Sequence, residues 1–174
     1  QKTPQENAQK YFAKYNKQKR TFEALSELIQ ETADEIRYLE SVSNSLDIAL
    51  SEADLGQIKE ELTASGYVRR KFTKKKVKLT NKPMHYISSD GYDIYVGKNN
   101  IQNDELTFSF ANGGDWWFHA KGAPGSHVIV KTNGDELPDR TFEEAGRLAA
   151  YYSKNRGSDK VEIDYIEKKH VKKP

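Results

Sequence analysis

A seven-residue repeat of apolar side chains runs through the first fifty residues of the chain. With Ala8 as position a of the heptad, the apolar residues include Tyr11, Tyr15, Phe22, Leu25, Ile29, Ile36, Leu39 and Leu46. Such a repeat is typical of a long helix in a coiled coil. Thr3-Pro4-Gln5-Glu6 has the pattern of a capping box, so we expect the helix to begin near Pro4. The apolar seam of this helix needs a partner helix to cover it. Without such a partner, we expect the chain to self-associate through the seam.

A second, shorter helix is predicted over about 52–65, with Gly66 as a terminator. The two helices would form a coiled-coil arm over residues 1–66. Residues 67–82 follow as a basic linker that includes Arg69, Arg70, Lys74 to Lys76 and Lys78. A start at Gln1 predicts that the chain is a segment of a longer protein. Its apolar runs are too short for a membrane helix, so we expect no membrane association.

The pattern changes from helical to alternating after the linker, which predicts a small α+β domain over residues 83–174 with a mostly antiparallel sheet. Strands are expected at about 85–87, 92–96, 116–120, 127–131 and 161–166. Ser88-Ser89-Asp90-Gly91 is typical of a hairpin turn. Helices are expected after an N-cap at 98–100 and over 142–154, where Thr141 and Glu144 are spaced as a capping box.

Polar residues cluster around the turn between the third and fourth predicted strands. Alternation places His119 and Lys121 on one face of the third strand, and His127 and Lys131 on one face of the fourth. Together with the backbone of Gly125 and Ser126, these donors predict a phosphate or other anion site. A structural alternative is that the two histidines only bridge strands by hydrogen bonds.

The first helix carries a basic cluster at its N-terminal end, followed by an acidic stretch. The cluster consists of Lys10, Lys14, Lys17, Lys19 and Arg20 and alternates with Tyr11, Phe12 and Tyr15. This arrangement predicts contact with nucleic acid through phosphates and stacking. A solubilising coat on a coiled coil is the alternative.

Catalysis is not predicted. The chain has four histidines and no cysteine, and it lacks a recognised metal-ligand spacing, so we expect no metal site. Ser126 and His127 are adjacent and would point to opposite faces of a strand, which disfavours a nucleophile and its base. Nucleotide-binding glycine motifs are absent, and no cofactor is expected.

Three long motifs resemble the NFACT family, and the resemblance covers nearly the whole chain. They are Pro4-Gln5-Glu6-Asn7-Ala8-Gln9-Lys10-Tyr11-Phe12, Val96-Gly97-Lys98-Asn99-Asn100-Ile101-Gln102-Asn103-Asp104, and Asp115-Trp116-Trp117-Phe118-His119-Ala120-Lys121 with Pro124-Gly125-Ser126-His127-Val128. The resemblance identifies residues 1–66 as the distal half of the family's middle coiled coil and about 83–174 as its RNA-binding R domain. We therefore add Lys98, Asn99 and Asn100 to the predicted nucleic-acid-binding residues.

The resemblance implies a cytoplasmic ribosome quality-control factor without catalytic residues. Such a protein binds the obstructed large ribosomal subunit, contacts rRNA and tRNA, and recruits alanyl-tRNA so that a stalled chain receives an alanine tail. This chain would lack the N-terminal domain, the outgoing helix of the coil and the end of the R domain, so we expect it to dock rather than to support tailing alone. Because some family members are called fibronectin-binding proteins, a surface adhesin that binds fibronectin is the alternative.

Overall fold

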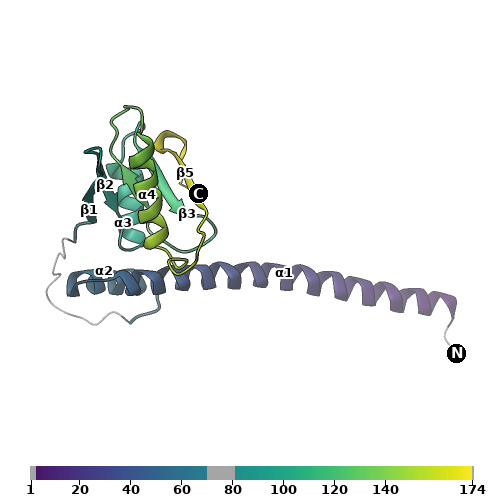
Figure 1. Cartoon of the computed structure of the whole chain (residues 1–174). Coiled ribbons are helices and arrows are strands. Elements are labelled where there is room, and N and C mark those ends of the chain that lie inside the picture. Colours follow the sequence, from purple (N-terminus) through teal and green to yellow (C-terminus); the bar gives the residue numbers. More distant parts are fainter. Residues whose placement is uncertain (1–2, 70–80, 174) are drawn as a thin grey trace. The chain divides into compact units, whose positions relative to one another are not determined.

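The computed structural model describes residues 3–69 and 81–173 and has the predicted α+β class (Figure 1). It divides into two compact units, one formed by residues up to Leu39 and the other by residues from Glu40 onward. The second unit contains the end of the first helix, the second helix and a five-stranded sheet. The sequence predicts a domain boundary after residue 66, where the pattern of apolar residues changes from helical to alternating. Most of the predicted linker, residues 67–82, lies outside the described residues.

Helix α1 spans Pro4–Ile48 and begins where its capping box predicts. The Thr3 backbone N–H donates to Glu6 Oε2 at 2.8 Å, and the Glu6 N–H donates to Thr3 Oγ1 at 3.2 Å. The apolar heptad side chains are exposed, since Phe22 is 72% and Ile29 68% accessible. This helix therefore presents an apolar stripe of the kind that a coiled-coil partner covers.

Helix α2 spans Glu52–Ala64, close to its predicted bounds. Ser51 caps its N-terminus by accepting the Asp54 N–H at 3.2 Å. Gly66 follows the C-cap with a φ of +84°, as expected of a left-handed terminator.

The sheet lies in the second half of the chain, and every neighbouring pair of strands is antiparallel. Its strands are β1 (Met84–Ile87), β2 (Asp93–Val96), β3 (Trp116–Ala120), β4 (Val128–Val130) and β5 (Ile163–Glu167), in the spatial order β1-β2-β4-β3-β5. A short 3₁₀ turn, η2 (Lys168–His170), follows β5. Strand β4 is at the centre of the sheet, and all three of its residues are buried. The hairpin predicted at Asp90-Gly91 is confirmed.

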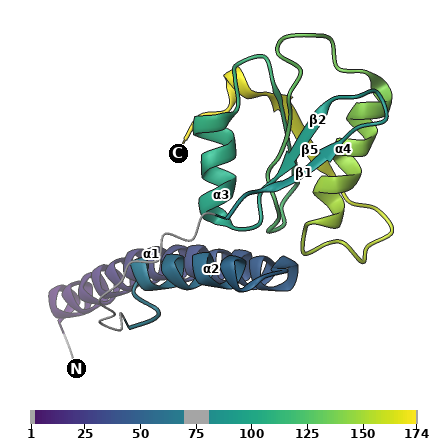
Figure 2. The ribbon, with the colours of Figure 1, turned by 90° about the vertical axis from the view of Figure 1, so that its left-hand side faces the viewer.

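Helices lie on both faces of the sheet (Figure 2). Helix α4 (Asp139–Tyr151) packs on one face, where Val128, Val130 and Phe118 meet Ala145 and Ala149 in a fully buried core. On the other face, α3 (Asn100–Glu105) continues into a π-helical turn, η1 (Leu106–Phe110). Since Phe118 is core and its neighbours Trp117 and His119 point the other way, the side chains of the candidate site belong to the face that carries α3.

The capping box predicted within Thr141-x-x-Glu144 is wrong, because the helix begins earlier and takes its cap from another segment. Thr141 donates its backbone N–H to Asp90 Oδ2 at 3.1 Å, and its hydroxyl lies 2.7 Å from the same oxygen. The Glu144 carboxylate instead accepts the backbone N–H of Ser89 at 2.9 Å. The β1–β2 turn thus caps α4, a tertiary contact that local spacing does not reveal.

Replacing Asp90 with Ala should therefore destabilise the domain by about 1–2 kcal/mol, the usual cost of losing a helix cap. Asp139→Ala is the matched control, because Asp139 is an exposed acid in the same first turn without a capping bond. Urea unfolding of both variants measures the difference. Equal stabilities of the two variants would contradict the capping role of Asp90.

Candidate nucleic-acid interface

Three aromatic side chains gather on the α3 face of the sheet, and we call Trp117, His119 and His127 the ring cluster. The rings of Trp117 and His119 are stacked with centroids 5.7 Å apart. His127 meets both edge-on, at 5.1 Å from Trp117 and 5.3 Å from His119. All three residues are half-buried, so the cluster has an accessible side. The structure thus brings together His119 and His127, the two histidines of the predicted anion site.

His127 is held in place by α3 and η1. Its Nδ1 lies 2.8 Å from Thr107 Oγ1, and its backbone N–H donates to Asn103 Oδ1 at 2.9 Å. Asn103 also donates to the Gly125 carbonyl at 3.2 Å. A side chain at Gly97 would place its Cβ 2.2 Å from Asn103 Oδ1, so only glycine lets this asparagine occupy its position. The glycine of the Val-Gly-Lys-Asn-Asn motif thus makes room for the residue that positions His127.

Burial makes both histidines weaker bases than free histidine. It lowers the pKa of His127 to about 4, an effect to which the neighbouring His119 adds. Burial also lowers the pKa of His119, against the opposing effect of Asp164. The imidazoles are therefore neutral at pH 7, and they offer stacking faces and single hydrogen bonds rather than the positive charges of an anion site.

Lys131 is engaged within the fold. Its Nζ pairs with Asp115 Oδ2 at 2.5 Å and lies 4.9 Å from the centre of the Phe110 ring. Asp115 is fully buried and also accepts the backbone N–H groups of Asn112 and Asn133. Since a buried carboxylate needs compensation, the Lys131 ammonium has a structural role here. A nucleic-acid contact by Lys131 stays a prediction.

The predicted turn between β3 and β4 divides into exposed and buried parts. The Lys121 side chain is 58% exposed and lies 3.2 Å from Glu162. Gly125 forms an isolated bridge with Ser153. The Ser126 backbone N–H donates to the Tyr152 carbonyl at 3.0 Å, and Ser126 is buried. This N–H is therefore not free to bind an anion, which corrects that element of the predicted phosphate site.

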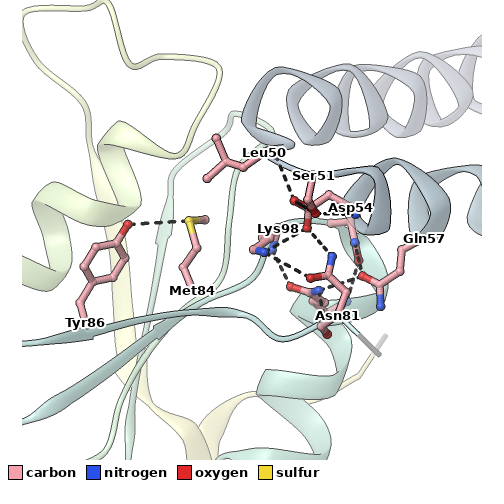
Figure 3. Close-up of polar contacts among 10 residues, drawn as sticks. Leu50, Ser51, Asp54, Gln57, Asn81, Met84, Tyr86 and Lys98 are labelled. Atoms are coloured by element: carbon pink, nitrogen blue, oxygen red, sulfur yellow. Dashed lines mark hydrogen bonds and ion pairs between the residues drawn. The ribbon is translucent and has the colours of Figure 1, made fainter. Parts of the chain in front are cut away.

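The predicted contacts Lys98, Asn99 and Asn100 face the helices instead of solvent. Lys98 Nζ lies 3.0 Å from Asp54 Oδ1 and 3.3 Å from Asn81 Oδ1 (Figure 3). Asn99 caps α3 through Gln102 and donates to Gln57 of α2. Their role in binding nucleic acid stays a prediction, and the bonds they make here are internal to the chain.

Sequence reasoning missed the partners of these three residues on α2. Asp54, Gln57 and Glu61 are spaced i, i+3 and i+7, so they share one helix face, and Asp54 and Glu61 are buried. A polar stripe at helical spacing is ordinarily taken as solvent-exposed. Only the fold shows that this stripe meets a complementary set of amides and an ammonium.

The predicted arm residues lie on α1 in the first compact unit. Lys10, Lys14, Lys17, Lys19 and Arg20 are all exposed, as are Tyr11, Phe12 and Tyr15. Lys19 approaches Glu23 at 4.0 Å, a pair too exposed to neutralise the cluster. Most of the predicted basic linker, residues 70–80, lies outside the described residues.

The described residues contain neither a candidate metal site nor a helix that could span a membrane. Within residues 3–69 and 81–173, no group of three or more histidine or carboxylate side chains is arranged to hold a metal ion. Within the same ranges, none of the helices combines the length and the apolar character that crossing a bilayer requires.

Two family models together match the whole chain. Residues 1–81 match the model of the NFACT N-terminal and middle domains, and residues 82–174 match the model of the NFACT protein RNA binding domain. The chain belongs to the NFACT family. The boundary between the two NFACT matches precedes β1, so the second match contains the whole sheet and the ring cluster.

Similar proteins include the Rqc2 homolog RqcH of Streptococcus suis, which is 48% identical over 99% of this chain and 31% of its own length. RqcH of Bacillus subtilis is 43% identical over 99% of the chain and 30% of its own length. This NFACT chain therefore spans about a third of those relatives. The C-terminal structure of the fibronectin/fibrinogen-binding protein from Streptococcus suis is also similar, with a TM-score of 0.86 and 47% identity over 98% of this chain and 68% of the other.

The buried state of His127 predicts a pH-dependent stability that His127→Gln removes, because glutamine keeps a hydrogen-bonding group but does not titrate. Below pH 6.5 an unfolded histidine takes up a proton, whereas the native one resists protonation until about pH 4. The wild-type protein should lose about 1.4 kcal/mol relative to the variant for each pH unit within that window. Urea unfolding between pH 7.5 and pH 4.5 tests this. A pH-independent difference between the two proteins would contradict it.

Proposed function

We propose that this chain is the docking and RNA-binding segment of a ribosome quality-control factor. The observation that carries the proposal is that residues 82–174, which match an RNA-binding domain, contain the half-buried ring cluster. The similar proteins support it, since they bear the names Rqc2 homolog RqcH and, in humans, ribosome quality control complex subunit NEMF, the latter 37% identical over 81 residues.

The ring cluster suits unstacked bases better than a phosphate. Proteins recognise single-stranded RNA by stacking bases on aromatic or histidine rings and by hydrogen bonds to base edges. Two neutral imidazoles beside an indole supply those contacts, and Lys121, exposed at the same turn, supplies a cation for the backbone. We infer that rRNA or tRNA presents a single-stranded segment to this face.

The basic end of α1 supplies the second contact in this proposal. Its five cations are exposed and adjoin exposed aromatic side chains. Ribosomal RNA offers a dense array of phosphates to such a surface, and the acidic stretch that follows on the helix would be repelled. We propose that this end docks on the large ribosomal subunit.

In the whole protein, these two contacts would support alanine tailing of stalled chains in the cytoplasm, with alanyl-tRNA bound through the longer protein. This segment would contribute binding and no catalysis. Because the chain spans about a third of its RqcH relatives, tailing itself is assigned to the complete protein and not to this segment.

Fibronectin binding is a second candidate function. It is favoured by one specific observation, the TM-score of 0.86 and 47% identity to a fibronectin/fibrinogen-binding protein of Streptococcus suis. A surface adhesin and a ribosome-bound factor have different partners, so one binding experiment can compare them directly.

Replacing His119 with Ala should weaken binding of a single-stranded RNA oligonucleotide about tenfold, because a stacking face is lost. The slope of affinity against salt should not change, whereas Lys121→Ala should reduce that slope by about 0.7, the value for one phosphate contact on a single strand. Arg147→Ala, an exposed charge change on α4, is the control for both. Fluorescence anisotropy across a salt series provides the measurement. Wild-type affinity in a folded His119→Ala variant would contradict the site.

Reversing the basic cluster of α1 to glutamate should abolish salt-sensitive co-sedimentation with purified large ribosomal subunits, since attraction becomes repulsion. The matched control replaces the four lysines with arginine, which retains the charge and should still pellet. Immobilised fibronectin tested in parallel separates the two candidate functions. Fibronectin binding without pelleting would favour the adhesin, and unchanged pelleting of the reversed variant would exclude this cluster as the docking contact.

A further inference from the structure

Three consecutive residues of the sheet domain meet three residues of α2 one to one. Lys98 lies 3.0 Å from Asp54, Asn99 donates to Gln57 at 2.9 Å, and Asn100 donates to Glu61 at 2.7 Å. We call these six residues the latch. Its α2 members share one helix face, and its other members lead directly into α3. All of them lie in the second compact unit, which begins at Glu40.

Burial distinguishes the latch from an exposed binding loop. Asp54 is 1% and Asn99 1% exposed, and the Lys98 side chain is only 14% exposed. Asp54 also accepts hydrogen bonds from the Leu50 backbone and from Ser51 (Figure 3). A buried carboxylate with this many donors is satisfied, and removing its charged partner, Lys98, leaves an uncompensated charge. The ammonium of Lys98 is thus already committed to a carboxylate.

A second group of contacts joins the end of α1 to the segment that follows α4. Lys154 pairs with Glu40, Arg156 approaches Asp47 at 4.0 Å, and Asn44 donates to the Tyr152 carbonyl at 3.3 Å. Asn100 also donates to Ser41 Oγ at 2.8 Å. The helical residues from Glu40 to Ala64 are therefore bound to the sheet domain through two separate segments of it.

The latch is connected to the ring cluster through α3. Asn99 caps this helix, Asn103 within it binds the backbone of His127, and Thr107 in the next turn contacts the imidazole. The Gly97 N–H donates to the His127 carbonyl at 3.1 Å. A shift of the latch would thus move the element that positions His127.

We propose that the latch holds residues 40–64 and the sheet domain together as one rigid body, and that Lys98, Asn99 and Asn100 are positioning residues and not RNA contacts. Only the effect on RNA affinity rests on the proposed function. The rigid junction itself is a property of the free protein. Because of this junction, residues 40–64 and the ring cluster keep the same distance and orientation while RNA binds.

Amide hydrogen exchange of the RNA-free chain tests the latch, comparing Lys98→Met with Lys98→Arg and with Lys121→Met. Lys98→Met keeps the length of the side chain but removes its charge, so α2 amides should exchange at least tenfold faster while those of β3 and β4 stay protected. Lys98→Arg retains the charge and should remain near wild type. Lys121→Met is the matched control at an exposed pair and should leave α2 unchanged.

Asn100→Ala is the second variant, in case Lys98→Met lowers the yield of folded protein. It removes the donor to Glu61 without stranding the Lys98–Asp54 pair, and α2 exchange should rise here too. Unchanged α2 protection in both variants would overturn the latch.

RNA affinity, measured on the same proteins, distinguishes a latch role of Lys98 from a direct RNA contact. A loss of affinity and of salt slope without faster α2 exchange would make Lys98 an RNA contact, whereas faster exchange in a chain that binds no RNA would refute only the proposed function.

Discussion

The alternation of side chains along β3 and β4 is the constraint on which the candidate site depends. In this antiparallel pair, Phe118 and Val128 face α4 in a fully buried core, so Trp117, His119 and His127 must face α3. A slip of one residue in either strand would exchange the core with the ring cluster. The packing of α4 therefore stabilises both the fold and the register that assembles the proposed RNA site.

Some polar residues of the domain are paired inside the fold, and others are accessible to solvent. Lys98 and Lys131 each pair with a buried carboxylate, Asp54 and Asp115 respectively, and so support the structure. The ring cluster is half-buried, and its imidazoles are neutral because burial lowers their pKa values. Recognition by this face is thus expected to depend on stacking and hydrogen bonds, with charge supplied by exposed groups such as Lys121 and the basic end of α1.

Local patterns in the sequence were sufficient to predict helices α1 and α2, the β1–β2 hairpin and the proximity of His119 to His127. The Thr3–Glu6 box, the turn at Gly91 and strand alternation each depend on neighbours in the chain. Contacts between distant segments were not predictable in this way. Asp90 replaced the expected local cap of α4, and the polar stripe on α2 matched Lys98 to Asn100 across a long sequence separation. Burial also changed the chemistry of His127, which sequence spacing alone does not report.

Amide hydrogen exchange of the wild-type chain with and without a single-stranded RNA oligonucleotide tests the central claim most directly. The account predicts added protection over residues 116–131, where the ring cluster lies, and no change at residues 98–100 or in α2. Protection concentrated at residues 98–100, together with faster exchange in α2, would contradict it. That result would mean that RNA replaces the carboxylate of Asp54 at Lys98 and that these residues are the contact surface.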